Sequence, residues 1–98
     1  MAIDDAQRDI VTRHADRLLT ARDYPKTICP SEVARALSPA ELSTLNAPDW
    51  RSTMDAIRAV VWEKREAGEV EVLQKGEVVR VERLEEIKGP MRVRLVKE

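Results

Sequence analysis

Cysteine and histidine are scarce in this 98-residue chain, which has one of each, Cys29 and His14. A single cysteine forms no disulfide within the chain. Cys29 and His14 together are too few to form a zinc site made of cysteine and histidine ligands. No serine lies in the glycine-flanked turn that presents a nucleophile, so acid-base or nucleophilic chemistry would depend on carboxylates alone. The sequence therefore predicts no metal site, no cofactor and no enzyme.

Long apolar runs are also absent. No stretch approaches the roughly 18 apolar residues that a membrane span needs. The first residues, Met1 to Asp5, lack the basic and apolar regions of a secretory signal. We therefore expect neither export nor membrane insertion, and the single cysteine suits the reducing cytoplasm.

Neither sign of charge dominates the chain. Its 17 basic and 18 acidic residues give a formal net charge of -1, although 36% of all residues are charged. This balance gives no overall attraction to nucleic acid, so the location of the charges has to decide between partners. The length and the 43% hydrophobic content suit a single domain, residues 1–98, around one core.

The first two thirds of the chain have helical patterns. Apolar residues recur at three- and four-residue steps from Ile3 to Ala21, which predicts an amphipathic helix. A second helix is expected at Cys29-Pro30-Ser31-Glu32, where proline fits the first helical position and the glutamate completes a capping box. Ser38-Pro39-Ala40-Glu41 repeats this pattern before a third main helix, which Asp49 caps and Gly68 ends. The expected buried stripe of that helix is Trp50, Met54, Ile57 and Val61.

Two later runs alternate as β-strands do, Glu69 to Val81 and Met91 to Val96. A turn at Lys75-Gly76 predicts a hairpin in the first run, and Thr27-Ile28 is expected to add a short strand. Helices followed by a small antiparallel ribbon are typical of a winged helix. We therefore predict an α+β winged-helix fold, with a three-helix core and a C-terminal wing of two or three strands. The pairs expected across the hairpin are Val72 with Val79, Val70 with Val81, and Glu71 with Arg80.

The third main helix is the element with which a winged-helix protein reads the major groove. Its expected outer face has three candidate nucleic-acid contacts, Arg51, Ser52 and Arg58. The same face has Asp55, which can neutralise Arg51 four residues away, and two glutamates that repel phosphate. A solvated surface helix explains this mixed pattern as well, so both interpretations stay open.

The segment from Lys88 to Lys97 is basic and has no acidic residue. Strand alternation places Arg92 and Arg94 on one face, where Lys75 and Arg80 of the hairpin join them as candidate phosphate contacts. Two or three such contacts give weak, salt-sensitive binding. The alternative is a solvated strand face whose arginines protect a sheet edge from aggregation.

Three single residues have two interpretations each. His14 lies on the apolar stripe of the first helix and is predicted to be packed and hydrogen-bonded rather than a ligand. Cys29 suits a redox-sensing thiol, but no second cysteine can resolve an oxidised one, which favours simple packing against Ile28. Trp62 is predicted either to stack with Arg58 as a cation–π pair or to lie in the core under the hairpin.

Four blocks in a fixed order are typical of a known family. They are Lys26 to Leu37, Trp50-Arg51 with Met54 and Arg58, Gly68 to Val72 with Gln74-Lys75-Gly76, and Gly89 to Leu95. With these blocks the chain resembles domain-of-unknown-function family 3253, a small bacterial family, over about residues 10 to 96. The resemblance implies a winged-helix-like fold and a bacterial, cytoplasmic protein. It implies no catalytic residue, ligand or partner.

The predicted function is that of a small winged-helix protein that binds double-stranded DNA or regulates transcription, with the third main helix as recognition element. The alternative is a protein-interaction or dimerisation module of the same fold. Near-neutral charge and the apolar Leu73-Val78 pair on the hairpin favour this alternative. Continuous basic surface across helix and wing favours DNA, whereas an exposed apolar patch favours a protein partner or a homodimer.

Overall fold

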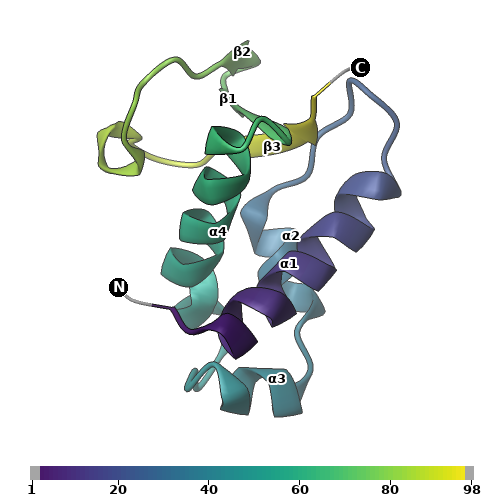
Figure 1. Ribbon diagram of the computed structural model, residues 1–98, viewed down its shortest axis with the longest axis vertical. Helices are drawn as coiled ribbons and strands as arrows, with labels where there is room; N and C mark the ends of the chain where they lie inside the picture. Colours follow the sequence, from purple (N-terminus) through teal and green to yellow (C-terminus); the bar gives the residue numbers. More distant parts are fainter. Residues whose placement is uncertain (1–2, 97–98) are drawn as a thin grey trace.

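Helices come first along the chain and a small sheet follows, as Figure 1 shows for the computed structural model, which describes residues 3–96. This α+β arrangement is compatible with a winged-helix-like layout, and the predicted fold class is confirmed. The helices are α1 (Asp5–Thr20), α2 (Pro30–Ala36), α3 (Pro39–Thr44) and α4 (Met54–Glu66), with the 3-10 turns η1 (Trp50–Thr53) and η2 (Leu84–Glu86). The strands are β1 (Val70–Gln74), β2 (Glu77–Val78) and β3 (Arg92–Leu95).

Helices α2 and α3 and the turn η1 begin at the predicted capping residues, Cys29, Ser38 and Asp49. Ser38 Oγ accepts the backbone N–H of Glu41 at 3.1 Å, and the Glu41 carboxylate accepts the N–H of Ser38 at 2.8 Å. The Glu32 carboxylate accepts the N–H of Cys29 at 2.7 Å at the start of α2. Asp49 caps η1, which continues directly into α4. These bonds satisfy amide groups that the first turn of a helix leaves without a partner.

The sheet has the order β2-β1-β3, and both strand pairs are antiparallel. β1 follows α4 directly, and the sheet lies across the C-terminal end of that helix (Figure 1). Ile28 forms an isolated bridge with Val93 of β3, so the short strand expected at Thr27-Ile28 is a single bridge residue. That bridge fixes the segment before α2 to the sheet.

The hairpin turns at Lys75-Gly76, as predicted. The two residues have φ values of 52° and 80°, a left-handed pair that suits a two-residue hairpin turn and that glycine adopts without steric cost. Leu73 pairs with Val78, and the Val79 amide donates to the Val72 carbonyl at 2.8 Å. The predicted register therefore holds next to the turn.

Farther from the turn the chain leaves the sheet. The cause is Arg65 of α4, whose guanidinium donates to the carbonyl of Val81 at 2.7 Å and to that of Val79 at 3.4 Å. The residues after β2 thus bond to a helix side chain instead of continuing the ladder, and β2 is two residues long. Two predicted pairs are wrong for this reason: Val70 with Val81, and Glu71 with Arg80.

The core lies between the helices and one face of the sheet. In α1 the buried stripe includes Leu19, while Leu18, which the three- and four-residue spacing places on that stripe, is only partly buried. In α4 the predicted Ile57 and Val61 are buried, whereas Trp50 and Met54 pack at the edge of the core. None of the helices within residues 3–96 is long and apolar enough to cross a membrane.

Candidate functional site

A pocket of about 530 Å³ lies where β1 ends and β3 begins, beside the start of α2. We call it the sheet-end pocket. Its volume falls in the range typical of small-molecule sites. Its lining includes Leu73, Pro90 and Met91, together with Cys29, the side chain of Gln74 and three basic residues, and no acidic residue. The lining of the sheet-end pocket therefore combines apolar side chains with positively charged ones.

The apolar part of the lining comes from side chains that fold against the sheet. Met91 is 1% exposed and Leu73 is 4% exposed. Because side chains alternate along a strand, Leu73 lies on the face opposite Val72, and it is buried without joining the core cluster. Its partner on β3 is Arg92. A buried apolar side chain and an exposed cation therefore lie next to each other on the outer face of the sheet.

The basic residues of the sheet-end pocket are Lys75, Lys88 and Arg92, and all three are exposed. Arg92 donates from Nε to Thr27 Oγ1 at 2.9 Å and from Nη2 to the Thr27 carbonyl at 3.3 Å. These acceptors are neutral, so they orient the guanidinium without neutralising its positive charge. In the described part of the chain none of the three cations forms an ion pair with a carboxylate.

Side-chain hydrogen bonds hold the segment that borders the sheet-end pocket. Gln74 Nε2 donates to the carbonyls of Lys88 and Pro90 at 2.8 Å and 3.1 Å. Arg58 of α4 donates to the carbonyl of Gly89, between them, at 3.3 Å. Three successive carbonyls thus accept bonds from two different elements, and the border of the pocket is formed before any ligand arrives.

Arg58 therefore contacts the wing, and the predicted stacking of Arg58 on Trp62 is wrong. The guanidinium that lies over the Trp62 ring belongs to Arg65, 4.2 Å from the centroid. Trp62 is 6% exposed and belongs to the core cluster, as the second interpretation expected. Its Nε1 has no hydrogen-bond partner among the described residues.

Ser52 and Arg51 lie in η1, at the N-terminal end of α4, whereas the sheet lies at the other end of that helix (Figure 1). The backbone N–H and the hydroxyl of Ser52 both donate to Asp49 Oδ1, at 3.0 Å and 2.9 Å. These bonds lower the pKa of Asp49. The structure therefore gives Ser52 a capping role and does not bring Ser52 or Arg51 to the sheet-end pocket.

Arg51 stacks over Trp50, 4.6 Å from the ring centroid, and does not pair with Asp55 as its spacing suggested. Arg35 of α2 lies over the same ring at 4.8 Å. Arg35 has no signal in the sequence that links it to Trp50, because only the packing of α2 against η1 brings the two together. Two arginines on one indole form a second, smaller basic site.

The remaining predicted contacts differ in their surroundings. Arg94 Nε lies 2.9 Å from Glu71 Oε1, and its guanidinium stacks over Tyr24 at 4.7 Å. Its charge is therefore neutralised within the sheet. Arg80 is exposed on the segment between β2 and η2. Lys97, the last basic residue of the predicted wing, lies outside the described residues.

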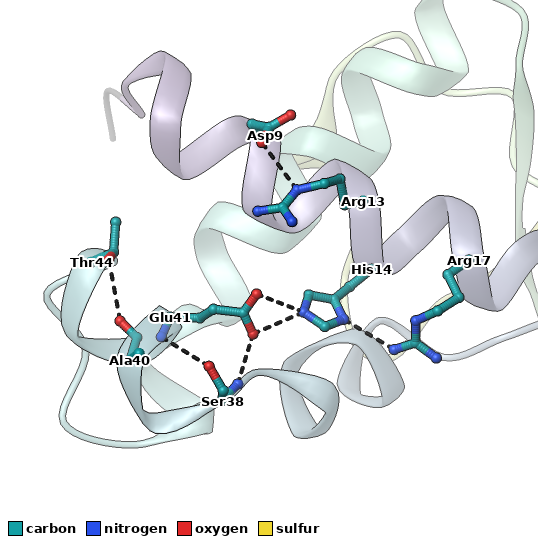
Figure 2. A network of polar contacts seen from close by, with 8 residues as sticks. All are labelled: Asp9, Arg13, His14, Arg17, Ser38, Ala40, Glu41 and Thr44. Atoms are coloured by element: carbon teal, nitrogen blue, oxygen red, sulfur yellow. Dashed lines mark hydrogen bonds and ion pairs between the residues drawn. The ribbon is translucent and has the colours of Figure 1, made fainter.

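His14 is half-buried and hydrogen-bonded, as predicted, and Figure 2 shows it between Glu41 of α3 and Arg17 of its own helix. Cys29 is partly buried, and its Sγ accepts the hydroxyl of Ser31 at 3.1 Å. Within residues 3–96 no group of three His, Cys, Asp or Glu side chains is placed to hold a metal ion.

The fold and the basic pocket define a small α+β protein with a winged-helix-like layout. The family model described as "Protein of unknown function (DUF3253)" matches residues 8–96. This match covers most of the chain, so the chain belongs to that family, and the resemblance seen in the four sequence blocks is confirmed. No curated protein matches the chain.

Proposed function

We propose that the chain binds nucleic acid through the phosphate backbone, with Lys75, Lys88 and Arg92 as the principal contacts. The observation that carries the proposal is the grouping of these three cations around one concave surface that has no acidic lining residue. Lysine and arginine bind phosphate oxygens, and the release of condensed counterions favours the complex. The position of the cations on a wing of a winged-helix-like layout adds an argument by analogy.

The proposal gives α4 a smaller role than the sequence suggested. Its Arg58 already donates to Gly89, and its exposed residues include Asp55, Glu63 and Glu66. Acidic groups repel phosphate, and base recognition needs side chains that are free to reach base edges. We therefore propose binding that is weak, sensitive to salt and little dependent on base sequence. Arg80 is a further proposed contact on the wing.

The test is fluorescence anisotropy with a labelled mixed-sequence DNA duplex at about 50 mM salt, where phosphate contacts are strong. The wild-type chain should bind saturably. Lys75→Gln/Lys88→Gln should weaken binding about tenfold, because two phosphate contacts are removed. The matched control is Arg8→Gln/Arg13→Gln, which removes the same charge from α1 and should leave the affinity within about twofold.

Two results would count against nucleic-acid binding at this site. One is the absence of saturable binding by a folded sample at low salt. The other is an equal loss of affinity in the pocket variant and in the α1 control, since that result assigns the attraction to net charge alone. Circular dichroism of each variant shows whether it is folded.

A protein partner is the second candidate function, and an exposed strand edge favours it. β2 forms the outer edge of the sheet, and Val78 on it is 37% exposed. An open edge offers backbone donors and acceptors to a strand from another chain. Light scattering coupled to gel filtration tests self-association, and Val78→Lys should abolish a dimer that forms through this edge.

A further inference from the structure

We infer that the sheet-end pocket is also a binding site for a small organic anion with an apolar body. A carboxylate or phosphate head would lie among Lys75, Lys88 and Arg92, and the body would lie against Cys29 and Pro90, above the buried Leu73 and Met91. This inference goes beyond the proposed function, because the pocket can take such a ligand whether or not the chain binds nucleic acid. Carboxylate and phosphate ligands have the anionic head in common. The apolar body distinguishes such a ligand from a free inorganic ion.

The shape and the chemistry of the sheet-end pocket select this class of ligand. Small-molecule sites are largely apolar concavities with a few placed polar groups, and the 530 Å³ volume exceeds what an inorganic ion fills. An inorganic ion would leave the apolar lining in water. A neutral apolar molecule would cover that lining but would gain nothing from the three cations.

The guanidinium of Arg92 and the border of the pocket are already positioned. Thr27 orients the guanidinium of Arg92, while Gln74 and Arg58 fix the carbonyls of residues 88–90. Ordering flexible groups reduces binding affinity, so a pocket that is held in advance binds more tightly than a mobile one. Lys75 is positioned differently, by the backbone of the hairpin turn.

The other concave surfaces do not have this combination. A larger one, of about 720 Å³, is lined by Arg22 and Lys26 but also by Asp23 and Glu69, so its charges oppose each other. The one between α4 and η2 has four glutamates in its lining and one arginine. Within the described residues the sheet-end pocket alone, among these surfaces, has basic groups without acidic ones.

The test is a two-dimensional nitrogen–proton NMR titration of the full chain, without nucleic acid, with octanoate and inorganic phosphate at up to about 10 mM and 1-octanol at up to about 3 mM, near its solubility. Octanoate should shift the amides of Leu73, Gln74 and Met91 saturably, with a dissociation constant on the order of 1 mM. Octanol and phosphate should each bind at least about fivefold more weakly, because each lacks one of the two parts of the ligand.

A charge reversal tests the role of the cations. Lys88→Glu should weaken octanoate binding about fivefold, whereas Arg13→Glu, the same reversal on α1, should leave it unchanged. The NMR spectrum of each variant also reports whether it is folded. Cys29 gives an independent readout, because it is the only cysteine and it lines the pocket. Octanoate should slow its alkylation by iodoacetamide in the wild-type chain and in Arg13→Glu.

Three outcomes would overturn the inference. Octanoate and octanol could bind equally, which would make the site a simple apolar patch. Octanoate could shift amides near cations all over the surface, which would make the binding nonspecific. A folded wild-type chain could show no saturable shift at the pocket. Since no nucleic acid is present, none of these results bears on the proposed nucleic-acid contacts.

Discussion

His14 Nε2 lies 2.9 Å and 3.0 Å from the two carboxylate oxygens of Glu41, and this contact joins α1 to α3 (Figure 2). Arg17 Nη2 lies 3.0 Å from His14 Nδ1. A guanidinium only donates, so His14 Nδ1 accepts from Arg17 and His14 Nε2 donates to Glu41. The same carboxylate caps α3 through Ser38. One glutamate therefore holds the start of α3 and fixes that helix to α1.

Glu41→Gln should lower the free energy of unfolding at about pH 7 by about 1 kcal/mol, since a capping and interhelical acceptor loses its charge. The backbone N–H of Ser38 and then the ring of His14 hold the pKa of Glu41 below its usual value of 4.5. An acid whose pKa is lowered by folding stabilises the protein fully when the pH is above its pKa in the unfolded chain. This stabilisation is lost as the pH falls through its pKa in the folded protein. Urea denaturation should show the gap between wild type and variant closing below about pH 4.5.

Glu66→Gln, an exposed site at the end of α4, is the control for that acid series. Its stability should follow the wild type at every pH. A gap between wild type and Glu41→Gln that stays constant in acid would show that the carboxylate is not the group responsible.

Lys64 is a buried cation whose Nζ lies 2.7 Å from Asp16 and 3.3 Å from Glu69. Its side chain is 8% exposed, but the two carboxylates are 52% and 57% exposed and can be hydrated without it. Lys64→Met should therefore stay within about 1 kcal/mol of the wild type, while Lys64→Ala should lose about 2 kcal/mol of packing. Equal losses in both variants, measured by urea denaturation, would assign the stability to the ion pairs.

Gln74→Ala should loosen the border of the sheet-end pocket without unfolding the chain. Its side chain donates to two carbonyls, so the loss should be about 1 to 2 kcal/mol and should fall on residues 88–91. Native-state hydrogen exchange should show faster exchange at Met91 than in the wild type, and unchanged exchange in α1. Uniform acceleration across both regions would mean that the bonds support the whole fold.

Arg65→Ala should release the segment after β2 from α4. The guanidinium covers Trp62 and bonds to the carbonyls of Val79 and Val81. In a Trp50→Phe background, which leaves one tryptophan, acrylamide quenching of Trp62 should therefore rise. Arg65→Lys keeps a donor and should restore part of the protection. Unchanged quenching in the alanine variant would show that other contacts cover the ring.

The helices could be predicted from the sequence because their signals are local. Proline at the first position and glutamate at the third identify helix starts within four residues, and Ser38 and Glu41 form the bonds that this pattern requires. The hairpin turn is equally local. The predicted pairing with β1 is wrong beyond Val79, because the side chain of Arg65, fourteen residues earlier in the chain, binds the backbone carbonyls of Val79 and Val81.

The sheet-end pocket could be predicted only in part. Arg92 and Arg94 were expected on one strand face, and their pairing with Leu73 and Glu71 of β1 agrees with that alternation, whereas Lys75 lies in the turn of the hairpin. Cys29 joins the pocket only because the bridge between Ile28 and Val93 brings the start of α2 to the sheet, and Lys88 because Gln74 holds the segment before β3. The pairing of Arg94 with Glu71, which removes one expected contact, follows from the position of β3 beside β1. Such contacts depend on tertiary packing.

The most direct test of the proposed phosphate contacts is the salt dependence of duplex binding between about 50 and 200 mM. The three principal contacts, Lys75, Lys88 and Arg92, predict a slope of about -2.7 for the logarithm of the association constant against the logarithm of salt concentration, and Arg80 as a fourth contact would make it about -3.6. Lys75→Gln/Lys88→Gln should reduce the size of that slope by about 2. A slope that is the same in wild type and variant would contradict the account, because the two lysines would then contact no phosphate.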